Sequence, residues 1–146
     1  MKPWLGLLCA LWLAGPAVAA PYMVSKRVDL RQALDDLTLA ASNHEMSLVK
    51  VQPIDSALVK RGYDNPHVRI AFVGNETAVR WAEAADPRLL NLLPIRLSLV
   101  QRGDEVVVIA DDLAPWAQEF KDSPGAPLLK ALEAEIKSLL DEFVRQ

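Results

Sequence analysis

Cysteine is almost absent from the chain, and this scarcity narrows the chemistry open to it. The only cysteine among the 146 residues is Cys9. It lies in an apolar stretch that we expect to be removed with a signal peptide. The mature protein would then hold no disulfide, no catalytic thiolate and no zinc or iron–sulfur site built on cysteine. Such a domain must be stabilised by its apolar core alone.

An excess of positive charge is missing as well. Lys and Arg number 16 against 19 Asp and Glu, and the formal net charge is −3. This balance does not favour a nucleic-acid backbone, so we expect no nucleic-acid partner. Histidine is limited to His44 and His67. Neither the nucleophile-elbow pattern G-x-S-x-G nor the zinc pattern H-E-x-x-H occurs, and we assign no cofactor and no metal.

The first 19 residues have the pattern of a secretory signal peptide. Lys2 supplies positive charge, and residues 5–14 form an apolar segment too short to span a bilayer. Small residues precede a cleavage point after Ala19, with Ala20 as the alternative. We therefore expect a periplasmic or secreted protein that has no membrane attachment once the peptide is cleaved.

Residues 20–146 are enough for one domain with a single core. Alternating apolar and polar residues predict five strands, over residues 22–28, 46–51, 68–73, 95–99 and 106–110. Helical spacing predicts helices over residues 30–41, 55–62, 76–85 and 127–144, and a short irregular or helical segment over 89–93. Asp29 and Asn75 are the expected N-caps. A proline-rich connector is expected over residues 111–126.

The predicted C-terminal helix has the strongest periodic signal. Its apolar residues share one face: Leu129, Leu132, Ile136, Leu139, Leu140 and Phe143. Together these patterns predict an α+β fold, a single two-layer sandwich. About five largely antiparallel strands would carry helices on one face, with the C-terminal amphipathic helix in addition. The other face would bear Arg69, Arg96 and Ser98.

The order of features over residues 22–113 resembles the family of domain of unknown function 302. The residues that carry the resemblance include Gly62, the run 68–75 with sequence VRIAFVGN, and Pro87. The Leu-Leu-Pro step at 92–94 and the hairpin over 95–110 also carry it. The resemblance implies a compact α+β sandwich that forms a homodimer, and it implies no activity. The long helix after residue 126 would be an addition specific to this chain.

The turn formed by Gly74 and Asn75 is the first candidate ligand site. It follows a strand and opens a helix, where free N–H groups and the helix dipole favour an anion. Arg69 or Arg96 could add positive charge from the sheet. The alternative is that Asn75 only caps the helix and that both arginines are solvated.

Two further sites are considered, each on weaker evidence. His44 and Met46 together would suit copper(I), which makes a copper carrier one alternative function. Asp111 and His67 could form the acid–base pair of a small periplasmic hydrolase or isomerase. Trp116, in the connector, is expected to pin that segment to the domain rather than to stack on a ligand.

The leading hypothesis is an exported, non-enzymatic, homodimeric module that binds a small anionic ligand or a protein partner. It rests on the signal peptide, on the family resemblance and on the missing catalytic motifs. Gly74, Asn75, Arg69 and Arg96 are its candidate binding residues.

Overall fold

Five strands pair into one sheet in a computed structural model of the protein, which describes residues 20–54, 60–62 and 65–146. The expected signal peptide and residues 55–59 of the expected second helix lie outside the described residues. The elements, in chain order, are β1 (Tyr22–Lys26), α1 (Leu30–Asn43), β2 (Ser47–Gln52), β3 (Val68–Gly74), α3 (Glu76–Ala85), the 3₁₀ helix η1 (Pro87–Leu92), β4 (Ile95–Arg102), β5 (Glu105–Ala110), α4 (Ala114–Glu119) and α5 (Ala126–Arg145).

The strand order across the sheet is β1-β5-β4-β3-β2, and every pairing is antiparallel. The α+β fold with one five-stranded antiparallel sheet is therefore confirmed. The β4–β5 hairpin closes through a two-residue loop between Arg102 and Glu105. Gly103 takes a φ of 63° at the first central position of this loop, where a tight hairpin turn requires glycine.

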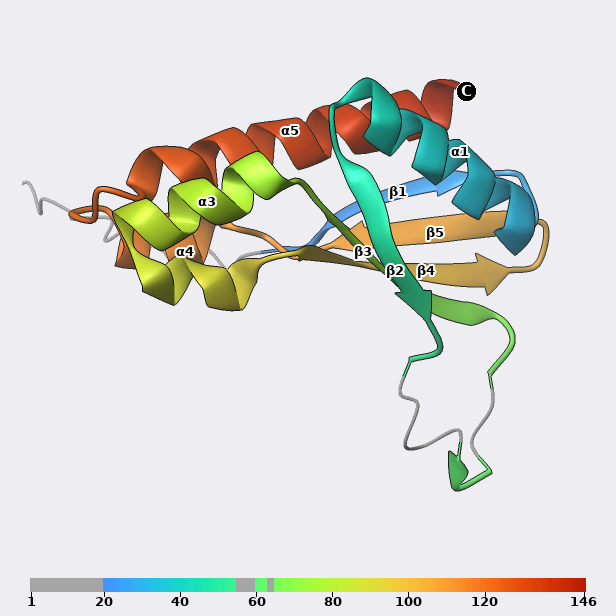
Figure 1. Ribbon diagram of the computed structural model, residues 1–146. Coiled ribbons are helices and arrows are strands. Elements are labelled where there is room, and N and C mark those ends of the chain that lie inside the picture. The colour runs from blue at the N-terminus through green and yellow to red at the C-terminus, as the bar shows by residue number, and fades with distance from the viewer. Residues whose placement is uncertain (1–19, 55–59, 63–64) are drawn as a thin grey trace, which may run out of the picture.

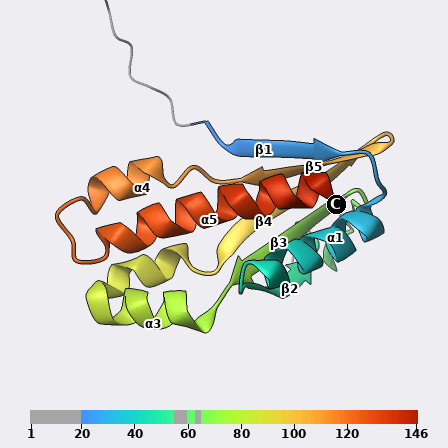
Figure 2. The ribbon, with the colours of Figure 1, turned by 90° about the horizontal axis from the view of Figure 1, so that it is seen from above.

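The helices gather on one side of the sheet. Figure 1 shows α1 and α5 above the strands, and Figure 2 shows α5 running across the sheet with α1 beside it. The segments α3, η1 and α4 extend past one end of the strands (Figure 2). Among the described residues, no helix combines the length and the apolar character needed to cross a membrane.

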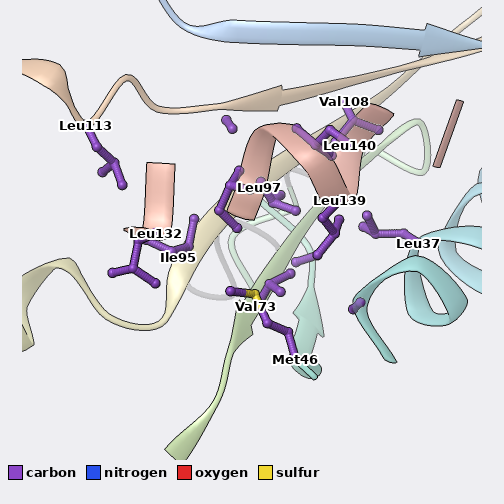
Figure 3. Close-up of a cluster of buried hydrophobic side chains, with 14 of the residues drawn as sticks. Leu37, Met46, Val73, Ile95, Leu97, Val108, Leu113, Leu132, Leu139 and Leu140 are labelled. Carbon is purple, nitrogen blue, oxygen red and sulfur yellow. The ribbon is translucent and has the colours of Figure 1, made fainter. Parts of the chain in front are cut away.

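The core lies between α5, α1 and the covered face of the sheet. The six apolar residues predicted to share one face of α5 are all at least 95% buried. They belong to one cluster with Leu97 and Leu99 of β4, Val106 and Val108 of β5, and Leu37 of α1. Figure 3 shows Leu132, Leu139 and Leu140 of α5 among Leu97, Val108 and Leu37. Burying a side chain of this size contributes about 1.5–3 kcal/mol, so α5 is a principal source of the fold's stability.

Capping residues set the ends of two helices where the sequence predicts them. The Asp29 carboxylate accepts the Gln32 N–H at 2.8 Å at the start of α1. The Asn75 side chain likewise accepts the Ala78 N–H at 2.8 Å at the start of α3. Each cap satisfies a backbone donor that would otherwise have no partner inside the helix.

The connector over residues 111–126 is more ordered than the sequence suggests, because it contains α4. Leu113 and Phe120, at the two ends of α4, are each 6% exposed, and both belong to the core cluster. The prolines at 115 and 124 led the sequence analysis to expect no helix here. Pro115, however, stands in the first turn of α4, a position where proline is compatible with a helix.

A carboxylate at the junction of α3 and η1 ties this end of the fold to the connector. Asp86 accepts hydrogen bonds from the Arg88 guanidinium (Nε at 3.0 Å, Nη2 at 2.7 Å) and from Ser123 Oγ at 2.8 Å. The Arg88 guanidinium also lies 4.8 Å from the centre of the Phe120 ring. The hydrogen bonds from Arg88, and then from Ser123, hold the pKa of Asp86 well below its usual range.

Shortening one buried side chain of α5 should test how much the core contributes to the stability of the fold. Leu139→Ala is expected to lower the free energy of unfolding by about 2–5 kcal/mol, because it removes most of a fully buried side chain and leaves a cavity in its place. Leu39→Ala is the matched control, since Leu39 is 54% exposed on α1. Urea denaturation followed by circular dichroism measures both. An equal loss in the two variants would contradict the described core.

The Asp86 hydrogen bonds should make stability depend on acid. Because folding lowers the pKa of Asp86, its carboxylate stabilises the fold above the unfolded value of 3.8, and this contribution is lost as the pH falls below that value. Asp86→Asn should therefore lower the melting temperature at pH 6, with the difference from the parent protein shrinking below pH 3.8. The control is Asp122→Asn, at an exposed aspartate beside Ser123. A gap that stays constant with pH would contradict the assignment.

Candidate functional site

The face of the sheet opposite α1 and α5 carries a continuous band of mainly apolar side chains. Strand residues alternate between the two faces, so the registers identify those that point away from the helices. We call this surface the open face; its central residues are Met23, Val68, Ile70, Phe72, Ser98, Val100, Val107 and Ile109. Within the described part of the chain, no helix lies over it (Figure 1).

Side chains of the open face differ in how much surface they retain. Met23, on the edge strand β1, is 53% exposed. Ile70 and Val107 are only 2% and 7% exposed, whereas Phe72 and Val100 are half-buried. Ile70 stands between Gln52 and Ser98, in register with both. The open face is therefore a tightly packed apolar surface rather than a scatter of exposed residues.

The expected grouping of Arg69 with Arg96 and Ser98 is wrong. Arg69 pairs with Leu99, a residue of the covered face, so its side chain leaves β3 on the helix side. Its guanidinium Nη1 donates to the backbone oxygens of Val68 (2.7 Å) and Asn65 (3.3 Å). The reason is the strand register. Ser98 pairs with Ile70, and residues 69 and 70 point to opposite faces because strand side chains alternate.

Gly74 and Asn75 lie at the same end of the sheet as Arg96, and Arg69 lies at the other end of β3. Phe72 pairs with Arg96, which puts Gly74 two positions further along the neighbouring strand. Asn75, however, is engaged: its side chain caps α3 and also donates to the Glu45 carbonyl at 3.3 Å. The carboxylate of Glu76 occupies the first turn of α3 and pairs with Arg80. That negative charge offsets the attraction of this helix end for an anion.

A cleft of about 350 Å³ lies at this end of the open face, and Arg96 lines it. We call it the Arg96 cleft; it is lined by Phe72, residues 91–96, Asp111, Leu113 and Trp116. Asp111 directly follows Ala110, the last residue of β5, which pairs with Leu97; continued by one position, this register brings Asp111 next to Arg96. Among the described residues, the Arg96 guanidinium has no ion pair within 4.0 Å, with Asp111 or with any other carboxylate.

Trp116 does not pin the connector, contrary to expectation. It projects from α4 with 45% of its surface exposed and lines the Arg96 cleft. Leu113 and Phe120 anchor α4 instead, since both are buried. Sequence reasoning could not choose among these three apolar residues, because α4 itself was not predicted and its buried side was therefore unknown.

A second cleft, of about 370 Å³, lies where α1 ends, α3 begins and α5 passes. His44 lines it, and both of its ring nitrogens contact carboxylates of α5: Nδ1 lies 2.6 Å from Glu135 Oε1, and Nε2 lies 2.9 Å from Glu142 Oε2. The hydrogen bond from the Asn43 amide is the main cause that lowers the pKa of Glu142, with Gln146 and His44 adding to it. His44 therefore joins the end of α1 to α5.

The expected copper site of His44 and Met46 is not formed. Met46 is 5% exposed and belongs to the core cluster, and the ring nitrogens of His44 are engaged by Glu135 and Glu142. In the part of the chain that the structure describes, no group of three or more His, Cys, Asp or Glu side chains is placed to hold a metal ion.

The expected catalytic pair of Asp111 and His67 is also wrong. The Gln101 N–H donates to the His67 carbonyl at 2.8 Å, which places His67 at the far end of β4. Asp111 lies beside Arg96, near the beginning of the same strand. Five residues of strand separate the two positions by about 16 Å, too far for a proton to pass directly or through one water.

Comparisons with known proteins agree with this architecture. The family described as "Domain of unknown function DUF302" matches residues 22–143. The match includes α5, so the expectation that the C-terminal helix is specific to this chain is wrong. The crystal structure of an uncharacterised conserved DUF302 protein from Bacillus stearothermophilus superimposes with a TM-score of 0.70. At 15% identity, that alignment covers 84% of this chain and 96% of the other.

The comparison with curated proteins found no match. The crystal structure, at its low identity, supports the fold and carries no information about a ligand or an activity. The family match is different in kind, because it spans the described domain from β1 almost to the end of α5. The chain therefore belongs to the DUF302 family of domains of unknown function.

Proposed function

We propose that the chain is an exported, non-enzymatic, homodimeric binding module whose open face packs against a second copy of itself. The observation that carries the proposal is the continuous apolar band across four strands that no described helix covers. Contiguous exposed apolar patches larger than a few hundred Å² are rare on monomeric soluble proteins and mark interaction surfaces.

The dimensions of the open face suit a dimer contact. Five strands about 4.8 Å apart and about six residues long span an area of about 20 Å by 20 Å. This area, about 400 Å², is about half of the 800 Å² that each partner buries in a standard interface, so the residues around the open face would have to supply the rest. A second copy is the natural occupant, because a two-fold axis lets one patch pair with itself. The homodimer implied by the family resemblance supports the same choice.

Arg96 is the residue we assign to ligand binding, as a contact for a small anion. Of the four candidate residues, it alone presents an ionic group without a carboxylate partner among the described residues and lines a cleft. The apolar band beside it also suits a protein partner. Two features support a binding role over an enzymatic one: the separation of Asp111 from His67, and the missing nucleophile motifs.

A charge placed on the open face should separate the two copies. The parent protein is expected to sediment as a dimer in analytical ultracentrifugation. Val100→Lys puts an ammonium in the middle of the open face and should yield a monomer with unchanged circular dichroism. Val144→Lys is the control: Val144 is 41% exposed on α5, on the opposite side of the sheet.

Three results would contradict the dimer proposal. The parent protein could sediment as a monomer at all concentrations. Both lysine variants could remain dimeric. The Val144→Lys variant alone could dissociate, which would place the contact on the helix side of the molecule.

Export should be visible in the mass of the protein. Expressed with its own N-terminus in a bacterium, the chain is expected in the periplasm with residues 1–19 removed. Intact-mass spectrometry distinguishes cleavage after Ala19 from cleavage after Ala20. Recovery of the full-length mass from the cytoplasm would contradict the export proposal.

A further inference from the structure

We infer that the Arg96 cleft binds a free α-amino acid that has an apolar side chain. The inference rests on the proposed function, because it names the class of ligand that Arg96 would hold. It is independent of the dimer contact, which involves the centre of the open face rather than this end of it.

Two opposite charges stand side by side in the cleft. Arg96 precedes Leu97 on β4, Asp111 follows Ala110 at the end of β5, and Leu97 pairs with Ala110; both charged residues line the cavity. The structure places no ion pair between them within 4.0 Å. A guanidinium recognises a carboxylate through parallel N–H donors, and a carboxylate accepts from an ammonium. The two charges of an amino acid match this arrangement.

A ligand with a single charge would fit less well. A simple anion bound by Arg96 would lie close to the negative charge of Asp111, and a simple cation bound by Asp111 would face Arg96. A zwitterion compensates both groups at once. Because Arg96 and Asp111 form no ion pair with each other, a ligand that inserts between them breaks no salt bridge.

The remaining walls are apolar and account for the side-chain preference. Phe72 lies in register with Arg96 on β3, and Leu92 and Leu93 come from the end of η1. Trp116 adds an indole that is 45% exposed. The volume of about 350 Å³ is near the lower limit of ordinary ligand sites, which suits a molecule the size of an amino acid.

The second cleft supplies a contrast within the same molecule. Trp81 lines that cleft and is 41% exposed, much as Trp116 is in the first. There, however, the ring nitrogens of His44 are taken by Glu135 and Glu142. The two tryptophans are therefore a matched pair: one lies beside a guanidinium without an ionic partner, and the other beside a charge cluster that is already satisfied.

The test is calorimetric titration of the exported protein, residues 20–146, with L-leucine, L-methionine and L-phenylalanine. Two analogues each remove one charge: 4-methylpentanoate lacks the ammonium, and leucinamide lacks the carboxylate. We expect the amino acids to bind and each analogue to bind at least about tenfold more weakly. Arg96→Ala and Asp111→Asn should each weaken leucine binding by a similar factor. The control is Arg102→Ala, at an exposed arginine at the other end of β4.

NMR of the indole N–H groups locates the ligand. Variants Trp116→Phe and Trp81→Phe identify the two indole resonances by their loss. Leucine should shift the Trp116 resonance in the parent protein and leave the Trp81 resonance in place. A shift of Trp81 alone would put the ligand in the second cleft and overturn the inference.

The analogues separate failure of this inference from failure of the proposed function. If 4-methylpentanoate binds as tightly as leucine and Asp111→Asn has no effect, the amino-acid inference is overturned while Arg96 remains an anion contact. If none of the three amino acids binds with a Kd below about 1 mM, the inference is likewise overturned. The dimer is judged separately, by ultracentrifugation of Val100→Lys.

Discussion

The packing of one helix on one face of one sheet is the constraint on which the other features of this protein depend. Leu139, Leu140 and Phe143 of α5 are completely buried against the strands, and α1 completes the same layer. The covered residues of β4 and β5 serve this single interface. Because strand side chains alternate, each strand residue that packs against α5 is followed by one whose side chain points to the open face. Alternation alone does not make the open face apolar; its apolar character comes from the residue types at positions such as Ile70, Val100 and Val107.

One-sided packing also explains where the candidate site lies. The segments α3, η1 and α4 have no place above the sheet, which α1 and α5 already cover, so they gather beyond one end of the strands (Figure 2). Asp86, Arg88 and Ser123 tie this end together through hydrogen bonds. The Arg96 cleft forms where these segments meet the end of the open face. The cleft is therefore a consequence of how the layers are filled. Variation at the exposed Trp116 of α4 would change its walls without removing a buried core residue.

Local signals in the sequence predicted most of the elements, and long-range arrangement accounts for the errors. The stripe of α5 and the caps at Asp29 and Asn75 depend on residues three or four positions apart, and each is confirmed. Relations between strands were harder. The side of Arg69 depends on a strand register, and the distance from Asp111 to His67 depends on the strand order, neither of which a single sequence reveals. The role of Trp116 was predicted wrongly because the prolines of this segment indicated a loop, so α4, which orients Trp116, was not predicted.

Hydroxyl-radical footprinting of the parent protein as a function of concentration tests the central claim most directly. Met23 on the open face and Trp81 on α3 are exposed to similar extents, at 53% and 41%, and both react readily with the radical. If the open face is the contact between two copies, oxidation of Met23 should fall as the concentration rises and recover on dilution, while that of Trp81 stays constant. Equal oxidation of Met23 at every concentration, or protection of Trp81 instead, would contradict the account.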